Sequence, residues 1–430
     1  MLEDRLYLIS RVFEGSSDQE SNWHYLAYHF HESLNTKKRV LDEGLAEVEE
    51  EEQGKRKKSL HQPVSPNKGD MNQSLDDSDD HTSNEAHSNP NILNRLTGDL
   101  IMTCFLHLSR SDYGAVASVN RAFRLMIRDL YKHRRREGIT EHWVYFSCTA
   151  LQWQAFDPYR KRWIKVPPMP ASLTETFTFS DKESLAVDTD LLVFGREMIS
   201  SVVLRYSILS NSWSPGVVMN SPRCLFGSAS LGGKAIIAGG ITNNGEILNS
   251  AELYDSETRT WEALPPMNRA RKMCSGVFMD GKFYVIGGMA NEREVLTCGE
   301  EYDLKRGSWK LILNMSAGLS GENGAPPLVA VVNNVLYAAR YADNVVMKYN
   351  KEHNTWEGLG KLPERSDSMN GWGIAFRACG ERLIVIGRRG PRGGMIELNS
   401  WVPNGGRPEW KTIAVMQSGD FVFNCAVMGC

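Results

Sequence analysis

Residues 271–315 read RKMCSGVFMDGKFYVIGGMANEREVLTCGEEYDLKRGSWKLILNM, and this stretch carries the pattern that decides the fold. It contains four short runs of β-forming residues, at 274–279, 282–286, 296–302 and 308–313. Asp280-Gly281 separates the first two runs and favours a tight hairpin, because glycine tolerates a positive φ. A four-stranded antiparallel sheet of this size cannot bury both of its faces alone. The stretch therefore predicts neighbouring sheets of the same kind.

One spacing within this stretch recurs along the chain. An aromatic residue stands seven positions before a tryptophan in five pairs, which are Phe156/Trp163, Tyr206/Trp213, Tyr254/Trp261, Tyr302/Trp309 and Tyr349/Trp356. The successive tryptophans are 50, 48, 48 and 47 positions apart. A period in this range is typical of a β-propeller, in which each repeat forms one four-stranded blade.

A sixth, irregular repeat and a displaced strand complete the count. The sixth unit covers about residues 373–416 and ends its pattern at Trp410, with a loop insertion expected at 403–408. The first unit begins with residues 142–148, which match the second strand of the other units. Residues 421–428 match the missing first strand, so we expect them to pair with 142–148. The sequence thus predicts a mainly β protein whose six-bladed propeller, residues 139–430, closes without a long exposed edge.

Composition and charge exclude several classes of function. The 430-residue chain has a net charge of -3, which gives no global indication of nucleic acid or an anionic membrane as a partner. No apolar run approaches the roughly 20 residues that span a bilayer, and residues 1–30 lack a signal-peptide core. The eight cysteines include no CxxC pair, which favours buried thiols in a reducing compartment. We expect a soluble intracellular protein of the nucleus, the cytoplasm or both.

Residues 1–90 differ in composition from the rest of the chain. From about residue 35 they are rich in acidic, Ser, Asn and Pro residues, so we expect this N-terminal region to be largely disordered. The apolar residues before position 34 allow either a short docking element or a loosely ordered terminus. Two basic clusters, at 37–39 and 55–58, are either a nuclear import signal or solvated charge runs.

Residues 91–138 show the periodicity of helices. Apolar side chains recur at steps of three and four, at Leu96, Leu100, Ile101, Cys104, Phe105 and Leu108, and again at Tyr113, Val116, Val119 and Phe123. A helical module this small predicts that part of its apolar surface meets a partner. The basic run at 132–136 is interpreted as a solvated helix face rather than a nucleic-acid contact. The short connection to residue 142 predicts a fixed relation between the module and the propeller.

The pattern at residues 93–128 resembles an F-box, the module that docks onto the Skp-type adaptor of SCF ubiquitin ligases. The resemblance includes the acidic-aromatic pair Asp112-Tyr113 and Arg121 before the last aromatic, and it departs from the family at Thr97, where proline is usual. It implies an adaptor-binding set consisting of Leu96, Leu100, Ile101, Cys104, Phe105, Leu108, Tyr113, Val116, Val119 and Phe123.

The propeller repeats, with the pairs Gly239-Gly240 and Gly287-Gly288, resemble the kelch family. In kelch substrate receptors, Arg and Ser residues just before the innermost strands bind the substrate, and the matching positions here are Arg223, Arg269, Arg271, Arg365 and Ser366. Guanidinium groups on a rim would favour an acidic or phosphorylated motif in the substrate. The alternative is that these arginines bond backbone carbonyls or form ion pairs within the protein.

An enzymatic function is a further alternative, because some kelch propellers are copper oxidases. A copper site needs clustered imidazoles, and the propeller region contains only His142 and His353, in different repeats. The sequence has no GxSxG, Walker A or HExxH motif. The loop GRRGPRGG at 387–394 lacks the following helix of a phosphate cradle, so we expect an ordinary loop. No catalytic residue, metal or cofactor is predicted.

The combination of the two modules is similar to plant F-box/kelch-repeat proteins. It implies a substrate-recognition subunit of an SCF ubiquitin ligase, in which the F-box recruits the Skp-type adaptor and through it the cullin, and the propeller selects the protein substrate. The alternative is a kelch scaffold that acts without a ligase, for instance by binding actin or a signalling protein.

Overall fold

The computed structural model describes residues 98–148, 152–170, 184–196, 201–319, 325–365, 371–389, 395–417 and 422–429. The expectations for residues 1–90, Leu96, Thr97 and Ser366 fall outside these ranges. Residues Thr97–Cys430 form one compact unit, which holds both the helices and the sheets. None of the described helices is long and apolar enough to cross a membrane.

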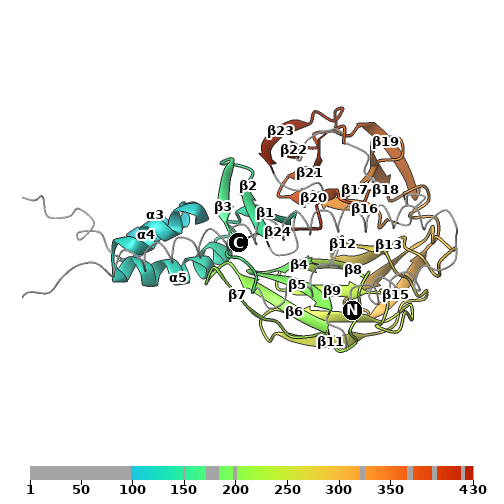
Figure 1. Ribbon diagram of the computed structural model, residues 1–430, viewed down its shortest axis with the longest axis horizontal. Coiled ribbons are helices and arrows are strands. Elements are labelled where there is room, and N and C mark those ends of the chain that lie inside the picture. The colour runs from blue at the N-terminus through green and yellow to red at the C-terminus, as the bar shows by residue number, and fades with distance from the viewer. Residues whose placement is uncertain are drawn as a thin grey trace, which may run out of the picture. The chain divides into compact units, whose positions relative to one another are not determined.

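Strands β1 to β24 form six antiparallel sheets of four strands each (Figure 1). Blade one has the order β24-β1-β2-β3, and blades two to six follow in chain order from β4 to β23. Blades one to three consist of β24 (Asn424–Gly429), β1 (His142–Ser147), β2 (Trp153–Asp157), β3 (Arg162–Lys165), β4 (Ser184–Val187), β5 (Asp190–Arg196), β6 (Ser201–Ser207), β7 (Ser212–Pro215), β8 (Gly227–Leu231), β9 (Lys234–Ala238), β10 (Ala251–Asp255) and β11 (Thr260–Leu264). Blades four to six consist of β12 (Ser275–Met279), β13 (Lys282–Ile286), β14 (Gly299–Asp303), β15 (Ser308–Ile312), β16 (Leu328–Val332), β17 (Val335–Arg340), β18 (Val345–Asn350), β19 (Thr355–Lys361), β20 (Ala375–Cys379), β21 (Arg382–Arg388), β22 (Met395–Trp401) and β23 (Lys411–Gln417).

The six blades close into a ring. The innermost strand of each blade contacts the innermost strands of both neighbouring blades, in the cycle β24, β4, β8, β12, β16, β20 and back to β24. Strand β24 pairs with β1 from His142↔Gly429 to Ser147↔Asn424. The structure confirms the six-bladed propeller and its closure, with the last strand at 424–429 where the sequence predicted 421–428.

The blade that decided the fold, residues 271–315, contains the predicted hairpin. Asp280 and Gly281 have φ angles of 55° and 69°, as a two-residue turn with two left-handed positions requires. Gly288 has a φ of 96°, and a Cβ placed on it would lie 2.6 Å from the carbonyl oxygen of Lys272. The third strand was predicted to start at 296 but starts at Gly299, because the preceding residues form a loop with an isolated bridge between Met289 and Val295.

In blade six, a second tryptophan takes the place of the tyrosine or phenylalanine that packs against the repeated tryptophan in the other blades. Trp401, the last residue of β22, packs against Trp410 with ring centroids 5.7 Å apart. In blade four, the rings of Tyr302 and Trp309 lie 4.9 Å apart in the corresponding contact. The two tryptophans are nine positions apart because residues 402–410 form a longer loop, as the sequence predicted.

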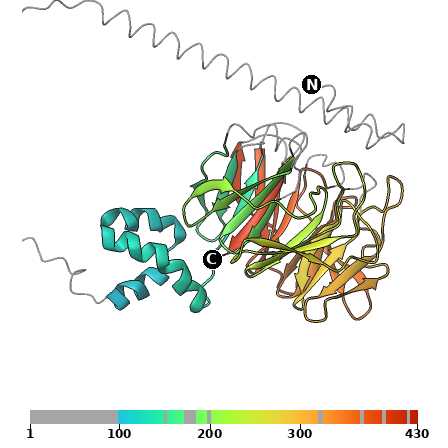
Figure 2. The same ribbon diagram turned by 90° about the horizontal axis from the view of Figure 1, so that it is seen from below.

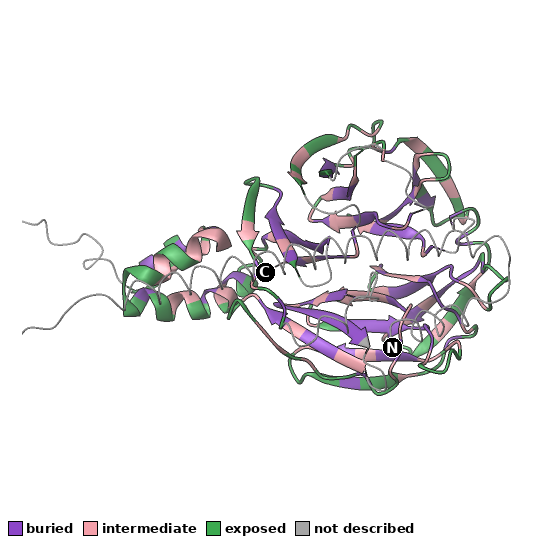
Figure 3. Ribbon diagram, in the orientation of Figure 1, coloured by how far each residue is buried: buried purple, intermediate pink, exposed green. Residues whose placement is uncertain are grey.

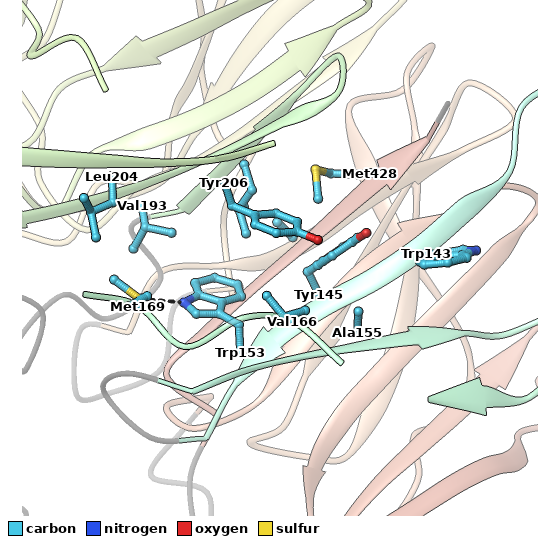
Figure 4. Packing of buried hydrophobic residues seen from close by; sticks show 12 residues of the cluster. Trp143, Tyr145, Trp153, Ala155, Val166, Met169, Val193, Leu204, Tyr206 and Met428 are labelled. Atoms are coloured by element: carbon cyan, nitrogen blue, oxygen red, sulfur yellow. Dashed lines mark hydrogen bonds between the residues drawn. The ribbon is translucent and has the colours of Figure 1, made fainter. Parts of the chain in front are cut away.

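Burial falls from the inner strands of each blade to the outer ones (Figure 3). The core lies between blades, and Figure 4 shows the cluster between blades one and two, where the Trp153 indole N–H lies 3.2 Å from the sulfur of Met169. Four outer-strand tryptophans, and Trp410 directly before β23, donate their indole N–H to a carbonyl at or just after the last strand of the preceding blade, in the pairs Trp213–Pro167, Trp261–Val217, Trp309–Pro265, Trp356–Met315 and Trp410–Lys361. The repeated tryptophan therefore fastens each of these blades to its neighbour.

The helices before the propeller are α3 (Gly98–Leu106), α4 (Tyr113–Val119) and α5 (Arg121–Arg136), with a short 3-10 turn η2 (Arg110–Asp112) between α3 and α4 (Figure 2). The rings of Phe105 and Phe123 pack edge to face with centroids 5.0 Å apart. The side chain of Asn120 caps α5 by accepting the Phe123 N–H at 2.8 Å. These contacts make the helices a small packed module.

Candidate functional site

The predicted adaptor-binding residues divide by burial. Ile101, Phe105 and Phe123 are buried and form the core of the helical module. Leu108, Tyr113 and Val116 are half-buried, and Cys104 is exposed. Among the described residues of the helical module, the large apolar side chains open to solvent are Leu100, 48% exposed, Val119, 62% exposed, and Leu125, 52% exposed, which the sequence did not single out. Hereafter Leu100, Cys104, Val119 and Leu125 are termed the exposed helical surface.

A buried carboxylate joins the helices to the propeller. Glu141 lies between α5 and β1 and is 6% exposed. It accepts hydrogen bonds from Ser109 Oγ at 2.9 Å, from the Arg110 backbone N–H at 3.2 Å and from the Trp143 indole N–H at 2.8 Å. Arg160, in the turn after β2, lies 3.1 Å from the same carboxylate. We call this arrangement the Glu141 joint.

Arginines of the helical module complete the Glu141 joint. Arg134 of α5 is 4% exposed and donates both of its terminal N–H groups to Glu141 Oε2 at 3.3 Å. The Arg110 guanidinium lies over the Trp143 ring, 4.1 Å from its centroid. The sequence interpretation of 132–136 as a solvated face was therefore wrong for Arg134, because its charge is needed to balance a buried carboxylate.

The environment of Glu141 keeps it charged. Burial alone raises the pKa of this carboxyl, but the hydrogen bonds from Trp143, the Arg110 backbone and Ser109 lower it, and so does the positive charge of Arg110. The lowering effects win, so the pKa of Glu141 lies below its usual value. The Glu141 joint is an ion pair and hydrogen-bond network at neutral pH.

A second contact joins α5 to blade two. Tyr131 donates its hydroxyl to Asp188, and Arg135 lies 3.2 Å from the same carboxylate. Asp188 occupies the turn between β4 and β5. On blade one, Arg162 of β3 lies 3.2 Å from Asp112. The helices thus contact two blades at separate points, which supports the expected fixed relation between module and propeller.

The strand order determines which face of the ring the helices contact. In an antiparallel blade, the turn after the first strand and the turn after the third strand lie at the same end of the sheet. Asp188 lies in a turn of the first kind and Arg160 in a turn of the second kind. We call the side of the ring that carries these two kinds of turn the hairpin face. The connections between blades and the loops after the second strands emerge on the opposite side, which we call the loop face.

The four described substrate-binding positions belong to connections on the loop face, but the side chains of three of them are inaccessible. The Arg223 and Arg271 side chains are fully buried. Arg223 lies 2.8 Å from Glu252 and Arg271 lies 2.7 Å from Glu300. Each guanidinium also donates to two backbone carbonyls of its own blade. Of the two interpretations given for these arginines, the geometry agrees with internal ion pairs.

The buried glutamates have a second task. Glu300 accepts the backbone N–H groups of Asn268 and Arg269 at 2.8 and 3.0 Å. Glu252 accepts those of Asn220 and Ser221 at 2.8 and 2.9 Å. Each carboxylate therefore binds the connection that enters its blade from the preceding blade. A local signal existed, since each glutamate stands two positions before the tyrosine of the repeated pair.

The remaining positions differ from one another. Arg269 is exposed and lies 3.5 Å from the exposed Glu294. The Arg365 side chain is buried beside Glu397 and Asn399 in blade six. Ser366 lies outside the described residues. Of the described predicted positions, Arg269 alone presents its guanidinium to solvent.

The described residues contain no group of three or more His, Cys, Asp or Glu side chains that could hold a metal ion. Burial raises the pKa of the Cys274 and Cys425 thiols to about 11, which disfavours the reactive thiolate. His142 lies at the start of β1, and burial lowers its pKa.

Comparison with known proteins agrees with these features. The Kelch motif model matches residues 222–268 and 270–316, which contain blades three and four. F-box/kelch-repeat protein At1g74510 of Arabidopsis thaliana is 49% identical over 458 residues, which cover 100% of both chains. The chain belongs to the F-box/kelch-repeat family. Two further F-box/kelch-repeat relatives from Arabidopsis thaliana are SKIP11, 50% identical over 81% of this chain and 76% of its own, and At1g26930, 48% identical over 83% and 87%.

Membership of the F-box/kelch-repeat family gives the two modules their names. The kelch propeller is the six-bladed ring, and helices α3 to α5 stand where the F-box resemblance was found. The F-box/kelch-repeat relatives and the kelch propeller together support a role for this protein as an adaptor in substrate recognition.

Proposed function

We propose that this protein is the substrate-recognition subunit of an SCF-type ubiquitin ligase. The F-box helices dock the Skp-type adaptor, and through it the cullin, while the loop face of the propeller binds the protein to be ubiquitinated. The observation that carries this proposal is the Glu141 joint, through which the helices contact the hairpin face. The adaptor and the substrate then occupy different surfaces and do not compete.

The mechanism is positioning rather than chemistry. A substrate on the loop face is held at a defined place relative to the adaptor, because the Glu141 joint and the Asp188 contact tie the helices to two blades. Holding two reactants in place lowers the entropic part of the barrier to their reaction. In this proposal the enzyme that carries ubiquitin supplies the reactive group, and the propeller supplies the location of the target lysine.

The exposed helical surface is the part of this proposal that an experiment reaches most directly. The full-length protein should co-purify with a Skp-type adaptor and a cullin, and Leu100→Asp should abolish that capture. Leu100 is 48% exposed, so the substitution should leave the melting temperature of the protein unchanged. Leu209→Asp is the matched control, because Leu209 is 55% exposed on the propeller.

The alternative is a kelch scaffold without a ligase. It predicts that the intact protein captures a cytoskeletal or signalling protein but no adaptor or cullin. Absence of the adaptor from the intact protein, or equal capture by Leu100→Asp and the intact protein, would reject the proposed docking surface. Affinity isolation while the proteasome is inhibited should enrich the substrate.

A further inference from the structure

Blade six contains a variation on the buried arginine of blades three and four. Arg365 occupies the place of Arg271, and its Nη2 lies 3.5 Å from the backbone carbonyl oxygen of Glu397. Glu397 stands four positions before Trp401, as Cys298 stands four positions before Tyr302. The position of Glu300 is held by Asn399, which accepts a hydrogen bond from Arg365. The carboxylate of blade six therefore stands two residues earlier in the third strand than that of blade four, and so closer to the loop face.

This shift lets one carboxylate hold two arginines. Glu397 Oε2 lies 3.5 Å from Nη1 of Arg365, and Glu397 Oε1 lies 3.0 Å from Nη1 of Arg389. The Arg365 side chain is 2% exposed, whereas the Arg389 side chain is 72% exposed. In blades three and four each buried carboxylate has one guanidinium partner in its ion pair. The group formed by Arg365, Glu397 and Arg389 thus carries one more positive than negative charge.

Arg389 stands directly after β21, the second strand of blade six, so it lies on the loop face. It shares the carboxylate of Glu397 with a second arginine, Arg365. By contrast, the exposed Arg269 on blade four is matched by one exposed carboxylate, Glu294. The sequence predicted an ordinary loop at 387–394, and residues 390–394 of it lie outside the described ranges.

We propose that Arg389 is an anion-binding residue, which takes a phosphorylated or acidic side chain of the substrate. This inference rests on the proposed function, in which the loop face binds the substrate. Buried Arg365 fixes Glu397, and Glu397 fixes one edge of the Arg389 guanidinium. A guanidinium has five N–H donors, so those not used by Glu397 can bind an oxyanion through two parallel hydrogen bonds.

Two physical features favour this site over a solvated charge. Glu397 holds Arg389 in one orientation, so a ligand does not bear the full entropic cost of ordering a long side chain. In addition, the group of Arg365, Glu397 and Arg389 keeps a net positive charge, which favours an anionic ligand. A phosphate monoester suits the site best, since it carries about -1.5 to -2 charges at neutral pH.

The test uses the full-length protein and three synthetic peptides of the form Gly-Gly-X-Gly-Gly, in which X is phosphoserine, glutamate or serine. Isothermal titration should give saturable binding of the phosphoserine peptide, weaker binding of the glutamate peptide and none of the serine peptide. Arg389→Gln should weaken the phosphoserine peptide roughly tenfold, as expected for the loss of a charge-assisted hydrogen bond. Its melting temperature should not change, because Arg389 is largely exposed.

Arg340→Gln is the matched control, because Arg340 ends β17, the second strand of blade five, and so belongs to the same face with its own carboxylate partner, Asp343. It should leave the affinity for the phosphoserine peptide unchanged. Equal losses in the two variants would mean that general surface charge attracts the anion, which would overturn the site. No saturable binding of either anionic peptide would overturn it as well.

The outcome is separable from that of the proposed function. Adaptor capture depends on the exposed helical surface and should be normal in Arg389→Gln. If the adaptor and a cellular substrate are captured equally by the intact protein and Arg389→Gln, the ligase proposal stands and the anion site falls. If the adaptor is never captured, peptide binding still reports on Arg389 by itself.

Discussion

The carboxylate of Glu141 accepts both terminal N–H groups of Arg134 at 3.3 Å, where helix α5 passes into strand β1. Both side chains are nearly inaccessible to water. Trp143 and Ser109 bind the other carboxylate oxygen, one from the propeller and one from the helical module. A single side chain therefore couples the stability of the two modules.

The first prediction concerns this coupling. Glu141→Ala should lower the free energy of unfolding by about 3–5 kcal/mol, because it leaves the Arg134 charge buried without its partner. The measurement is chemical denaturation of the full-length protein. Glu357→Ala, in the exposed outer strand β19, should change the free energy of unfolding by no more than about 0.5 kcal/mol. If both variants unfold alike, the Glu141 joint has no energetic role.

The second prediction separates structural from recognition arginines. Arg271→Ala should cost about 3–5 kcal/mol of stability, because Glu300 would remain buried and charged. Arg269→Ala should cost about 0–1 kcal/mol, as for other exposed ion pairs. Replacing the pair together, as Arg271→Met with Glu300→Leu, should recover much of the loss. Normal stability of Arg271→Ala with loss of substrate capture would instead restore Arg271 as a binding residue.

The third prediction concerns ring closure. Removing residues 424–430 takes away β24 and exposes the edge of β1 and the apolar side chains packed around it. The truncated protein should melt at a lower temperature, and the amides of β1 should lose their protection from hydrogen exchange. A truncated protein that melts at the original temperature, with the original cooperativity, would contradict closure by this strand.

The fourth prediction follows from His142. Burial lowers its pKa from the ordinary 6.5, and the nearby positive charge of Arg110 lowers it further. The unfolded chain then binds a proton more readily than the folded one, so the contribution of His142 to stability is complete above pH 6.5 and declines as the pH falls below it. The slope is at most about 1.4 kcal/mol per pH unit.

The measurement for His142 compares two proteins at two pH values. The free energy of unfolding should fall more between pH 7.5 and pH 5.5 for the natural protein than for His142→Gln. Because both proteins keep their other titratable groups, the difference isolates His142. An identical fall in both proteins would show that the pKa of His142 is the same in the folded and the unfolded protein.

The sequence predicted the ring because the signals for a blade are local. Tyr302 and Trp309 lie on neighbouring strands joined by a short turn, so their interval survives as a fixed number of residues. The displaced strand at 424–429 was predictable from the gap that it fills in the first repeat. Strand ends shifted by a few residues where a loop, as at Met289 and Val295, replaced regular pairing.

The site was harder to predict because its contacts are not local. The partners of Glu141 lie up to 32 positions away, at Ser109 for example, and they form no repeat. Arg271 was assigned to the rim by family resemblance, although the sequence contains a signal for its pairing with Glu300. Arg223 to Glu252 and Arg271 to Glu300 both span 29 positions, and a repeated interval between opposite charges indicates an internal pair.

The pairing of β24 with β1 also has a consequence for the order of synthesis. His142 and its partner Gly429 are almost the full length of the propeller apart in the sequence, with the F-box helices before them both. At about 5–20 residues per second, the ribosome needs on the order of tens of seconds to make the intervening chain. The F-box helices therefore emerge long before the ring can close. Under the proposed function, a nascent chain would present its adaptor-docking helices before it has a finished site for its substrate.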